Sequence, residues 1–210
     1  MGDNATPDAG TAKPDIIEDS PFPLTDIDRW VLSQTDEEFH LHNWDELREI
    51  IAANNLSALK RKPSDLRRYM AWSQDIKVEY GSMTAYLLTH RLPWGSPPFS
   101  YSSPVPFKDP SDYKILKNDW PYGLTPDITH IVVWSKTPIP TDAKTGDLTP
   151  ESRQIIEDFV NRTFVDRLGH DNNRVIWFKN WVALQSVRAL EHIHILVKDA
   201  DEEILEEWTR

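Results

Sequence analysis

Apolar residues in the second half of the chain alternate in short blocks that are typical of β-strands. The clearest block follows Glu191, where branched apolar residues surround two histidines and continue to Val197. Blocks of this kind predict four strands, over 113–116, 128–134, 174–178 and 192–197. A helical spacing over 150–168, opened by Thr149 and Pro150, predicts a helix between the second and third strands.

The first half of the chain shows the three-to-four-residue apolar spacing of helices. A short helix is expected after the N-cap Thr25, a second over 44–54, and the longest over 64–91, with Gly81 in its middle. A proline-rich segment then separates the helices from the first strand. It is either a plain connector or a lid over the site.

These elements predict an α+β fold whose parts follow one another along the chain. The predicted parts are a disordered tail at 1–20, a helical extension at 21–92, a proline-rich connector at 93–111, and an α+β core with a C-terminal helix at 112–210. The tail is expected to be disordered because it lacks large apolar groups.

Composition narrows the classes of function. The 210 residues contain no cysteine, which excludes disulfides, thiolate catalysis and cysteine-based zinc sites. No apolar run is as long as a membrane span, and the first residues lack a signal peptide, so we expect a cytoplasmic protein without a membrane partner. The net charge of −11 argues against an extended nucleic acid, but a local basic pocket for one small phosphate is still allowed.

The strand that follows Glu191 carries the candidate chemistry. His192 and His194 are two residues apart, so their side chains point to the same face of the strand. Two core histidines satisfied by backbone carbonyls are one interpretation. A phosphate-attacking histidine with a helper, or a pair of metal ligands, are the others.

A second segment bears on this choice. It contains Asn-Asp-Trp-Pro-Tyr-Gly at 118–123, then His130 at the opening of an apolar strand, and Lys136 after it. Together with the strand of alternating histidines, it resembles the two signature blocks of the histidine-triad superfamily, over about residues 112–198. The resemblance implies an antiparallel sheet with helices, and an activity that hydrolyses nucleotides or transfers nucleotidyl groups.

The resemblance also implies roles for individual residues. In the superfamily the middle of three alternating positions is the nucleophile, but here Leu190 or Leu196 stands at one outer position. We favour His194 as the nucleophile and His192 as the residue that orients it or the phosphate, both of them only partly buried. The substrate-binding residues that the resemblance suggests are Asn118, Tyr122, Asn180, Ser186, Arg188 and Lys136.

The chain as a whole resembles a fungal family, that of N-acetylglucosamine-induced protein 1. The similarity rests on Tyr-Met-Ala-Trp at 69–72, Ile-Lys-Val-Glu-Tyr-Gly at 76–81, the block at 118–123, and Trp-Phe-Lys-Asn at 177–180 followed by the histidine strand. This resemblance implies a fungal source and a link to the amino-sugar response, but no mechanism.

The function expected from the sequence is a histidine-triad-like enzyme or binder for a nucleotide or another small phosphate compound. One alternative is a metal-dependent enzyme in which His192 and His194 are ligands, completed by His130 or Glu191. The other is a non-catalytic regulatory protein of the amino-sugar response. The sequence identifies no cofactor, and it leaves a homodimer open.

A second His-x-His pair, His40 and His42, lies near the acidic residues 36–38. We expect these to be surface histidines, with metal binding as the alternative.

Overall fold

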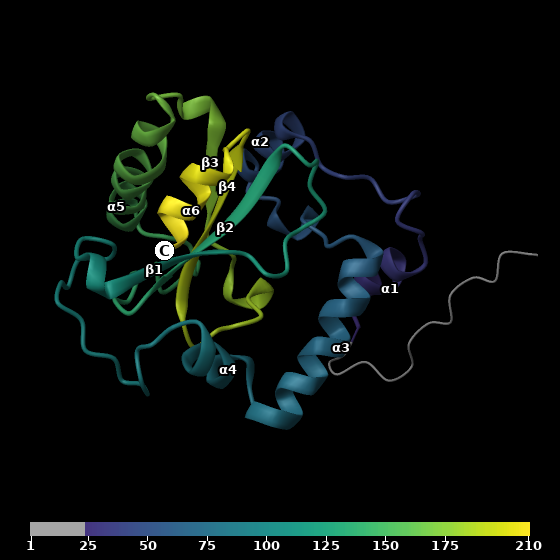
Figure 1. Ribbon diagram of the computed structural model, residues 1–210, viewed down its shortest axis with the longest axis horizontal. Coiled ribbons are helices and arrows are strands. Elements are labelled where there is room, and N and C mark those ends of the chain that lie inside the picture. Colours follow the sequence, from purple (N-terminus) through teal and green to yellow (C-terminus); the bar gives the residue numbers. More distant parts are fainter. Residues whose placement is uncertain (1–23) are drawn as a thin grey trace, which may run out of the picture.

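The computed structural model describes residues 24–210, so the tail expected at 1–20 lies outside the described residues. The described chain is an α+β fold built on one four-stranded antiparallel sheet (Figure 1). Its strands are β1 (Tyr113–Lys117), β2 (Ile128–Ser135), β3 (Val175–Phe178) and β4 (Glu191–Lys198), in the order β1-β2-β4-β3 across the sheet. The four strands and the α+β class predicted from the sequence are confirmed.

Within the described part of the chain, six α-helices lie around the sheet. They are α1 (Asp26–Leu32), α2 (Trp44–Ala52), α3 (Pro63–Tyr80), α4 (Met83–His90), α5 (Pro150–Val160) and α6 (Glu202–Thr209). After α5 the chain continues through a π-turn over 161–165 and a 3-10 turn over 166–168, so the helical path reaches the predicted end. Within residues 24–210 no helix combines the length and apolarity that a membrane crossing requires.

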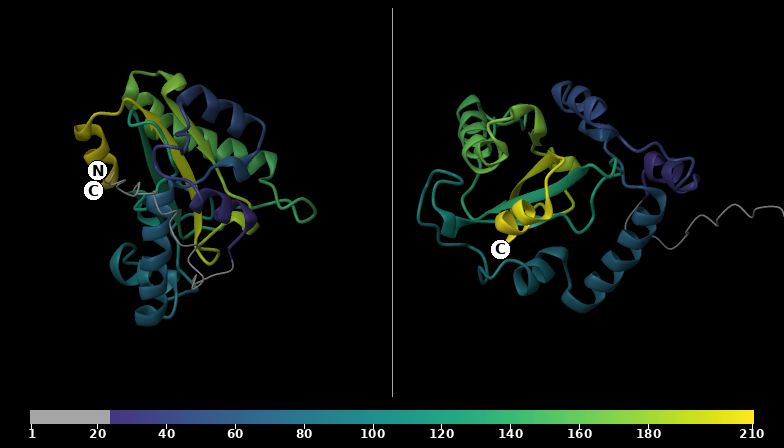
Figure 2. Two further views of the ribbon diagram at one scale, coloured as in Figure 1. Left: turned by 90° about the vertical axis from the view of Figure 1, so that its right-hand side faces the viewer. Right: turned by 45° about the horizontal axis from the view of Figure 1, so that its top comes forward.

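Alternation along the two central strands divides their side chains between two layers. In the β2–β4 register, Val132 lies opposite His194 and Trp134 lies opposite His192. The intervening residues point to the other face, where they form the main core with residues of α5 and the turns after it. In the right-hand view of Figure 2, α5 lies on one side of the sheet and α3 and α4 lie on the other.

The N-terminal helices cover the histidine face at its two ends. At one end Trp44 and Leu47 of α2 pack in a cluster with Leu196. At the other end Leu87 of α4 packs with Val132 and other buried residues. The histidines lie between these two apolar clusters.

The single long helix expected over 64–91 is wrong, because the chain breaks at Gly81. This glycine has φ 77°, the left-handed conformation that ends α3, and its N–H donates to the Lys77 carbonyl. Ser82 then begins α4 as its N-cap, with a side chain that accepts from the N–H of Ala85. The apolar spacing continues across the break, and so it does not reveal the change of direction.

The proline-rich segment is fastened to the sheet by one buried carboxylate. Asp112 is fully buried and accepts hydrogen bonds from the backbone N–H groups of Ser102 and Ser103, at 2.8–2.9 Å. Its Oδ1 also lies 3.4 Å from Nζ of Lys136, just beyond β2. Burial alone would raise the pKa of Asp112, but these hydrogen bonds and the lysine together lower it.

We predict that Asp112→Asn lowers the free energy of unfolding at neutral pH by about 1.5–3 kcal/mol, because the hydrogen bonds to a charged acceptor are weakened. The folded pKa lies below the unfolded value of about 3.9, so this stabilisation is complete above that pH and disappears as the pH falls through the folded pKa. Urea unfolding of both proteins measures the difference. Asp166→Asn, which removes an exposed carboxylate paired with exposed His170, is the control and should change stability by less than about 0.5 kcal/mol. An equal loss of stability in Asp112→Asn and Asp166→Asn would contradict the stabilising role of the buried Asp112 carboxylate.

Candidate functional site

Three histidines meet on the covered face of the sheet. His130 comes from β2, and His192 and His194 come from β4. Nε2 of His130 and Nδ1 of His194 are hydrogen-bonded at 2.9 Å, and the ring centroids of His192 and His194 are 5.3 Å apart. The three side chains are 4–7% exposed, so the expectation of partly buried site histidines is wrong. They are buried because α2, α3 and α4 cover this face.

Both ring nitrogens of His194 are engaged. Nδ1 pairs with His130, and Nε2 lies 3.2 Å from the side-chain amide nitrogen of Asn180. The Asn180 amide also donates to the Tyr122 hydroxyl at 3.0 Å. Phe178 stacks on the His194 ring, with centroids 4.9 Å apart and planes 11° apart. His194 is therefore held from several sides and has no ring nitrogen left to attack a substrate.

His192 differs from His194 in its hydrogen bonding. Its Nδ1 lies 2.8 Å from the backbone carbonyl of Leu190. A carbonyl only accepts, so Nδ1 carries the proton, and Nε2 of the neutral ring keeps its lone pair. Among residues 24–210, Nε2 has no hydrogen-bond partner. The ring packs against Trp134, with centroids 4.7 Å apart.

Burial sets the charge of all three rings. It lowers the pKa of His130 to about 3 and that of His192 to about 4, and it lowers the pKa of His194 well below the ordinary value. Nearby positive charge acts in the same direction, from Arg61 on His130 and from Lys179 on His192. At neutral pH these are neutral imidazoles, which is the form that can attack phosphorus or accept a proton.

The Asn118–Gly123 block forms the wall beside His130. The Asn118 amide nitrogen lies 3.3 Å from the His130 ring, and Tyr122 stacks on that ring with centroids 5.1 Å apart. At the end of the block, a Cβ on Gly123 would lie 3.0 Å from Cζ of Phe39 and closer still to another ring atom, so a side chain there would collide with the phenyl ring. Glycine allows the block to pack against the segment before α2.

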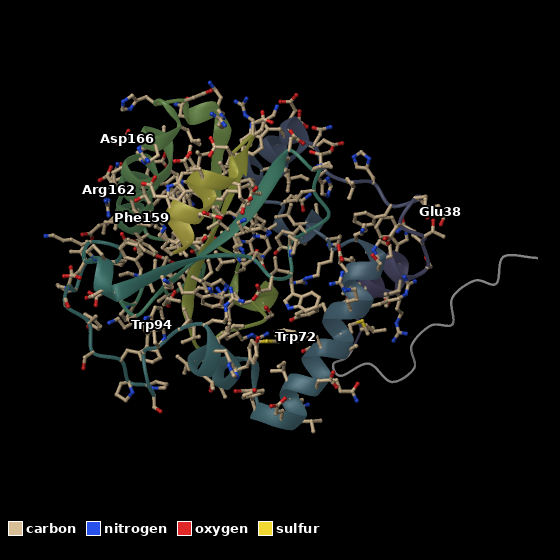
Figure 3. The ribbon with its side chains drawn as sticks, in the orientation of Figure 1. Glu38, Trp72, Trp94, Phe159, Arg162 and Asp166 are labelled. Atoms are coloured by element: carbon tan, nitrogen blue, oxygen red, sulfur yellow. The ribbon has the colours of Figure 1, made fainter. Side chains whose placement is uncertain are left out.

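A cavity of about 710 Å³ lies between the histidine face and the N-terminal helices, with His192 and His194 in its wall. Trp72 projects from α3 toward the sheet and lines it (Figure 3). The cations in its lining are Lys60, Arg61, Lys77, Lys117 and Arg188, and the acids are Asp28 and Asp119. Burial lowers the pKa of Lys60. The cavity thus combines cationic and aromatic groups, although the chain as a whole is acidic.

The structure brings most of the predicted site residues to this cavity. Its lining includes His192, His194, Asn118, Tyr122, Asn180, Ser186 and Arg188. Lys136 is the exception, because it pairs with Asp112 outside the lining. No residue of the proline-rich segment 93–111 lines the cavity either, and Phe107 of that segment is fully buried in the main core. The segment is therefore packed into the fold and is no lid over this cavity.

Sequence reasoning missed the contribution of the helical extension. Arg61 lies before α3, and its Nε donates to the Trp120 carbonyl at 3.2 Å. Its guanidinium lies 4.1 Å from the centroid of the Tyr69 ring. The basic run Lys-Arg-Lys at 60–62 is the only signal in the sequence, and a short basic run by itself does not indicate a pocket.

We predict that the His192 ring remains neutral at about pH 5, because burial lowers the pKa of His192 to about 4. An ordinary imidazole, with a pKa of about 6.5, is mostly protonated at that pH. We also predict that its proton is on Nδ1. Nitrogen chemical shifts of the histidine rings during a pH titration measure both properties, and His192→Gln assigns the signals. Protonation of Nε2 at neutral pH, or a midpoint near the ordinary value, would contradict this description of the site.

Comparison with known proteins places the chain in a family. N-acetylglucosamine-induced protein 1 of Candida albicans is 33% identical, in an alignment that covers 78% of this chain and 71% of the relative. An uncharacterised Saccharomyces cerevisiae protein, YPL067C, is 26% identical over 80% of this chain and 84% of its own length.

A solved structure titled "Crystal Structure of HTC1" matches with a TM-score of 0.65 at 24% identity, over 79% of this chain and 91% of that one, and shows a similar fold. The model of the protein family of unknown function DUF3605 matches residues 43–198, which include the whole sheet and both histidine strands. The chain therefore belongs to the DUF3605 family.

Proposed function

We propose that the cavity binds a small phosphate compound, with a nucleotide as the leading class, and that His192 attacks its phosphorus. The observation that carries the proposal is the tautomer of His192. The Leu190 carbonyl holds the proton on Nδ1, which leaves the Nε2 lone pair at the wall of a cationic cavity. This reverses the roles expected from the sequence, in which His194 was the favoured nucleophile.

The lining of the cavity suits both parts of a nucleotide. Arg61 and Arg188 can neutralise phosphate oxygens, and Ser186 offers a hydroxyl donor. Trp72 and Trp120 offer faces on which a base can stack. The side-chain oxygen Oδ1 of Asn180 is buried without a partner among the described residues, and a donor on a ligand would satisfy it.

The chemical step uses the neutral ring. Nε2 of His192 forms a bond to phosphorus while the bond from phosphorus to the leaving oxygen breaks, and the electron pair leaves with that oxygen. The Nδ1–H bond to Leu190 stabilises the positive charge that develops on the ring. Water then displaces the imidazole from phosphorus, loses a proton, and so releases the phosphate product and restores the neutral ring. Here His194 and His130 are positioning residues, because their hydrogen bond fixes the wall beside His192.

The geometry weakens the metal alternative at this face. His194 has no free nitrogen, and Glu191 points to the opposite face of β4, where its carboxylate lies 3.3 Å from Nζ of Lys179.

The non-catalytic alternative has one observation in its favour. With His192 as the middle residue, Leu190 occupies the outer position that a third histidine would take, and it is buried in the cluster with Leu87 of α4.

We predict that AMP and UMP quench the fluorescence of the cavity tryptophans and that the matching nucleosides without phosphate do so much more weakly, because the cations recognise phosphate. Arg188→Ala should weaken nucleotide binding about 10-fold, which corresponds to about 1.4 kcal/mol. Arg153→Ala is the matched control. It removes an exposed arginine of α5 that lies over the Trp177 ring of β3, and it should leave binding unchanged. Equal binding of nucleosides and nucleotides would contradict a phosphate site.

We predict that His192→Gln lowers turnover of any adenylyl or uridylyl compound that the wild type hydrolyses by at least about 100-fold, while nucleotide binding changes little. Product release from a panel of such compounds is the measurement, with inorganic phosphate and nucleoside monophosphates as products. Binding by the wild type without turnover of any compound would favour the non-catalytic alternative. Undiminished turnover by His192→Gln would exclude His192 as the nucleophile.

A further inference from the structure

A second histidine cluster lies outside the cavity, at the start of α2. His40 and His42 come from the segment that precedes this helix, and Glu46 lies in its first turn. One ligand atom from each of the three side chains lies within 4.8 Å of the others, a grouping that can hold a metal ion. None of the three lines the histidine cavity. This pair was expected to be a pair of surface histidines, but only His40 is well exposed, at 67% of its side chain against 17% for His42.

His42 is oriented as metal-binding histidines are. Its Nε2 lies 3.3 Å from the Ala58 carbonyl, which only accepts, so Nε2 carries the proton and Nδ1 keeps the lone pair. Nδ1 is buried without a hydrogen-bond partner among the described residues, and it lies 3.8 Å from a carboxylate oxygen of Glu46. Ligand histidines in proteins usually donate their second N–H to a backbone carbonyl in this way. An unpaired buried nitrogen that faces a carboxylate is costly unless a cation lies between them.

Glu46 and His40 complete the set. Glu46 is fixed by the capping box of α2, since its Oε2 accepts from the Asn43 N–H at 2.9 Å. Its other oxygen lies 2.7 Å from Nε2 of His40. Because His40 is largely exposed, its ring can rotate to adjust the ligand distances.

We propose that His40, His42 and Glu46 bind a divalent transition-metal ion, with Zn²⁺ as the best match. Two imidazole nitrogens and one carboxylate oxygen are a donor set that zinc accepts, with water from the open side as the fourth ligand. Zinc ligands at about 2.0–2.1 Å in a tetrahedron are about 3.3–3.4 Å apart. The two histidine-to-carboxylate separations, 2.7 Å from His40 to Oε1 of Glu46 and 3.8 Å from His42 to Oε2, lie on either side of this value. All three ligand atoms lie within 4.8 Å of one another, so rotation of the exposed His40 ring and of the Glu46 carboxylate would close the site.

The site has a structural consequence for the loop beside it. The backbone of His42 donates to the Gly123 carbonyl and accepts from the Thr125 N–H, both at 3.0 Å. A metal on His42 would therefore fasten α2 to the loop that carries Tyr122. This inference does not rest on the proposed function of the cavity.

The test is titration of the metal-free full-length protein with Zn²⁺ by calorimetry, together with thermal unfolding with and without Zn²⁺. We expect one equivalent to bind, and the unfolding midpoint of the wild type to rise. His40→Ala, at an exposed position, and His42→Ala should each weaken binding at least about 10-fold and abolish the rise. His170→Ala, which removes an exposed histidine paired with Asp166, should behave as the wild type.

His192→Ala distinguishes this site from the histidine cavity, and it should bind zinc as the wild type does. Glu46→Gln keeps a capping side chain on α2 but removes the charged ligand, so it should fold normally and bind zinc more weakly. Equal affinity of the wild type and His40→Ala would overturn the proposal. The proposal would also be overturned if His192→Ala lost zinc binding while His40→Ala and His42→Ala both kept it. Zinc would then be bound by the histidines of the sheet.

Discussion

The antiparallel pairing of β2 with β4 is the constraint on which the rest of the molecule depends. Along the middle of these strands every second residue is a branched apolar residue that faces the α5 layer, so the register is fixed by what must be buried there. A shift of one residue would place the histidines in that core and the branched residues against the cavity. The same register puts His130 beside His194, and Trp134 beside His192, without any local motif that specifies these contacts.

The cavity is lined by several basic residues, although the chain as a whole is acidic. The chain carries a net charge of −11, whereas Lys60, Arg61 and Arg188 line one cavity beside the buried histidines. Charged imidazoles could not be buried among these cations at an acceptable free-energy cost. Neutral rings can, because the two ring nitrogens of His194 are hydrogen-bonded, one to His130 and the other to the side-chain amide nitrogen of Asn180. This arrangement is the basis of our proposal that the cavity binds an anionic ligand.

Much of the fold could be predicted from the sequence, because the four strands and the helices beside them follow from apolar periodicity. The shared face of His192 and His194 followed from strand geometry as well. The different roles of the two histidines could not be predicted, because they depend on the Leu190 carbonyl and on Asn180, which folding brings into place. Lys136 could not be placed either, since its partner Asp112 follows the proline-rich segment. Arg61 reaches the site only because the N-terminal helices fold back over the sheet, and no short-range pattern reports such a contact.

The contact between Gly123 and Phe39 links two segments that are far apart in the sequence. Any side chain at position 123 meets the phenyl ring, so the ring must move or be replaced by a smaller side chain before position 123 can become larger. The two positions are thus expected to covary in evolution. Since Gly123 follows Tyr122 at the cavity and Phe39 precedes the histidines near α2, changes near one site are constrained by the other. The pocket and the start of α2 would then be inherited as a single unit, even in relatives whose remaining surface has diverged.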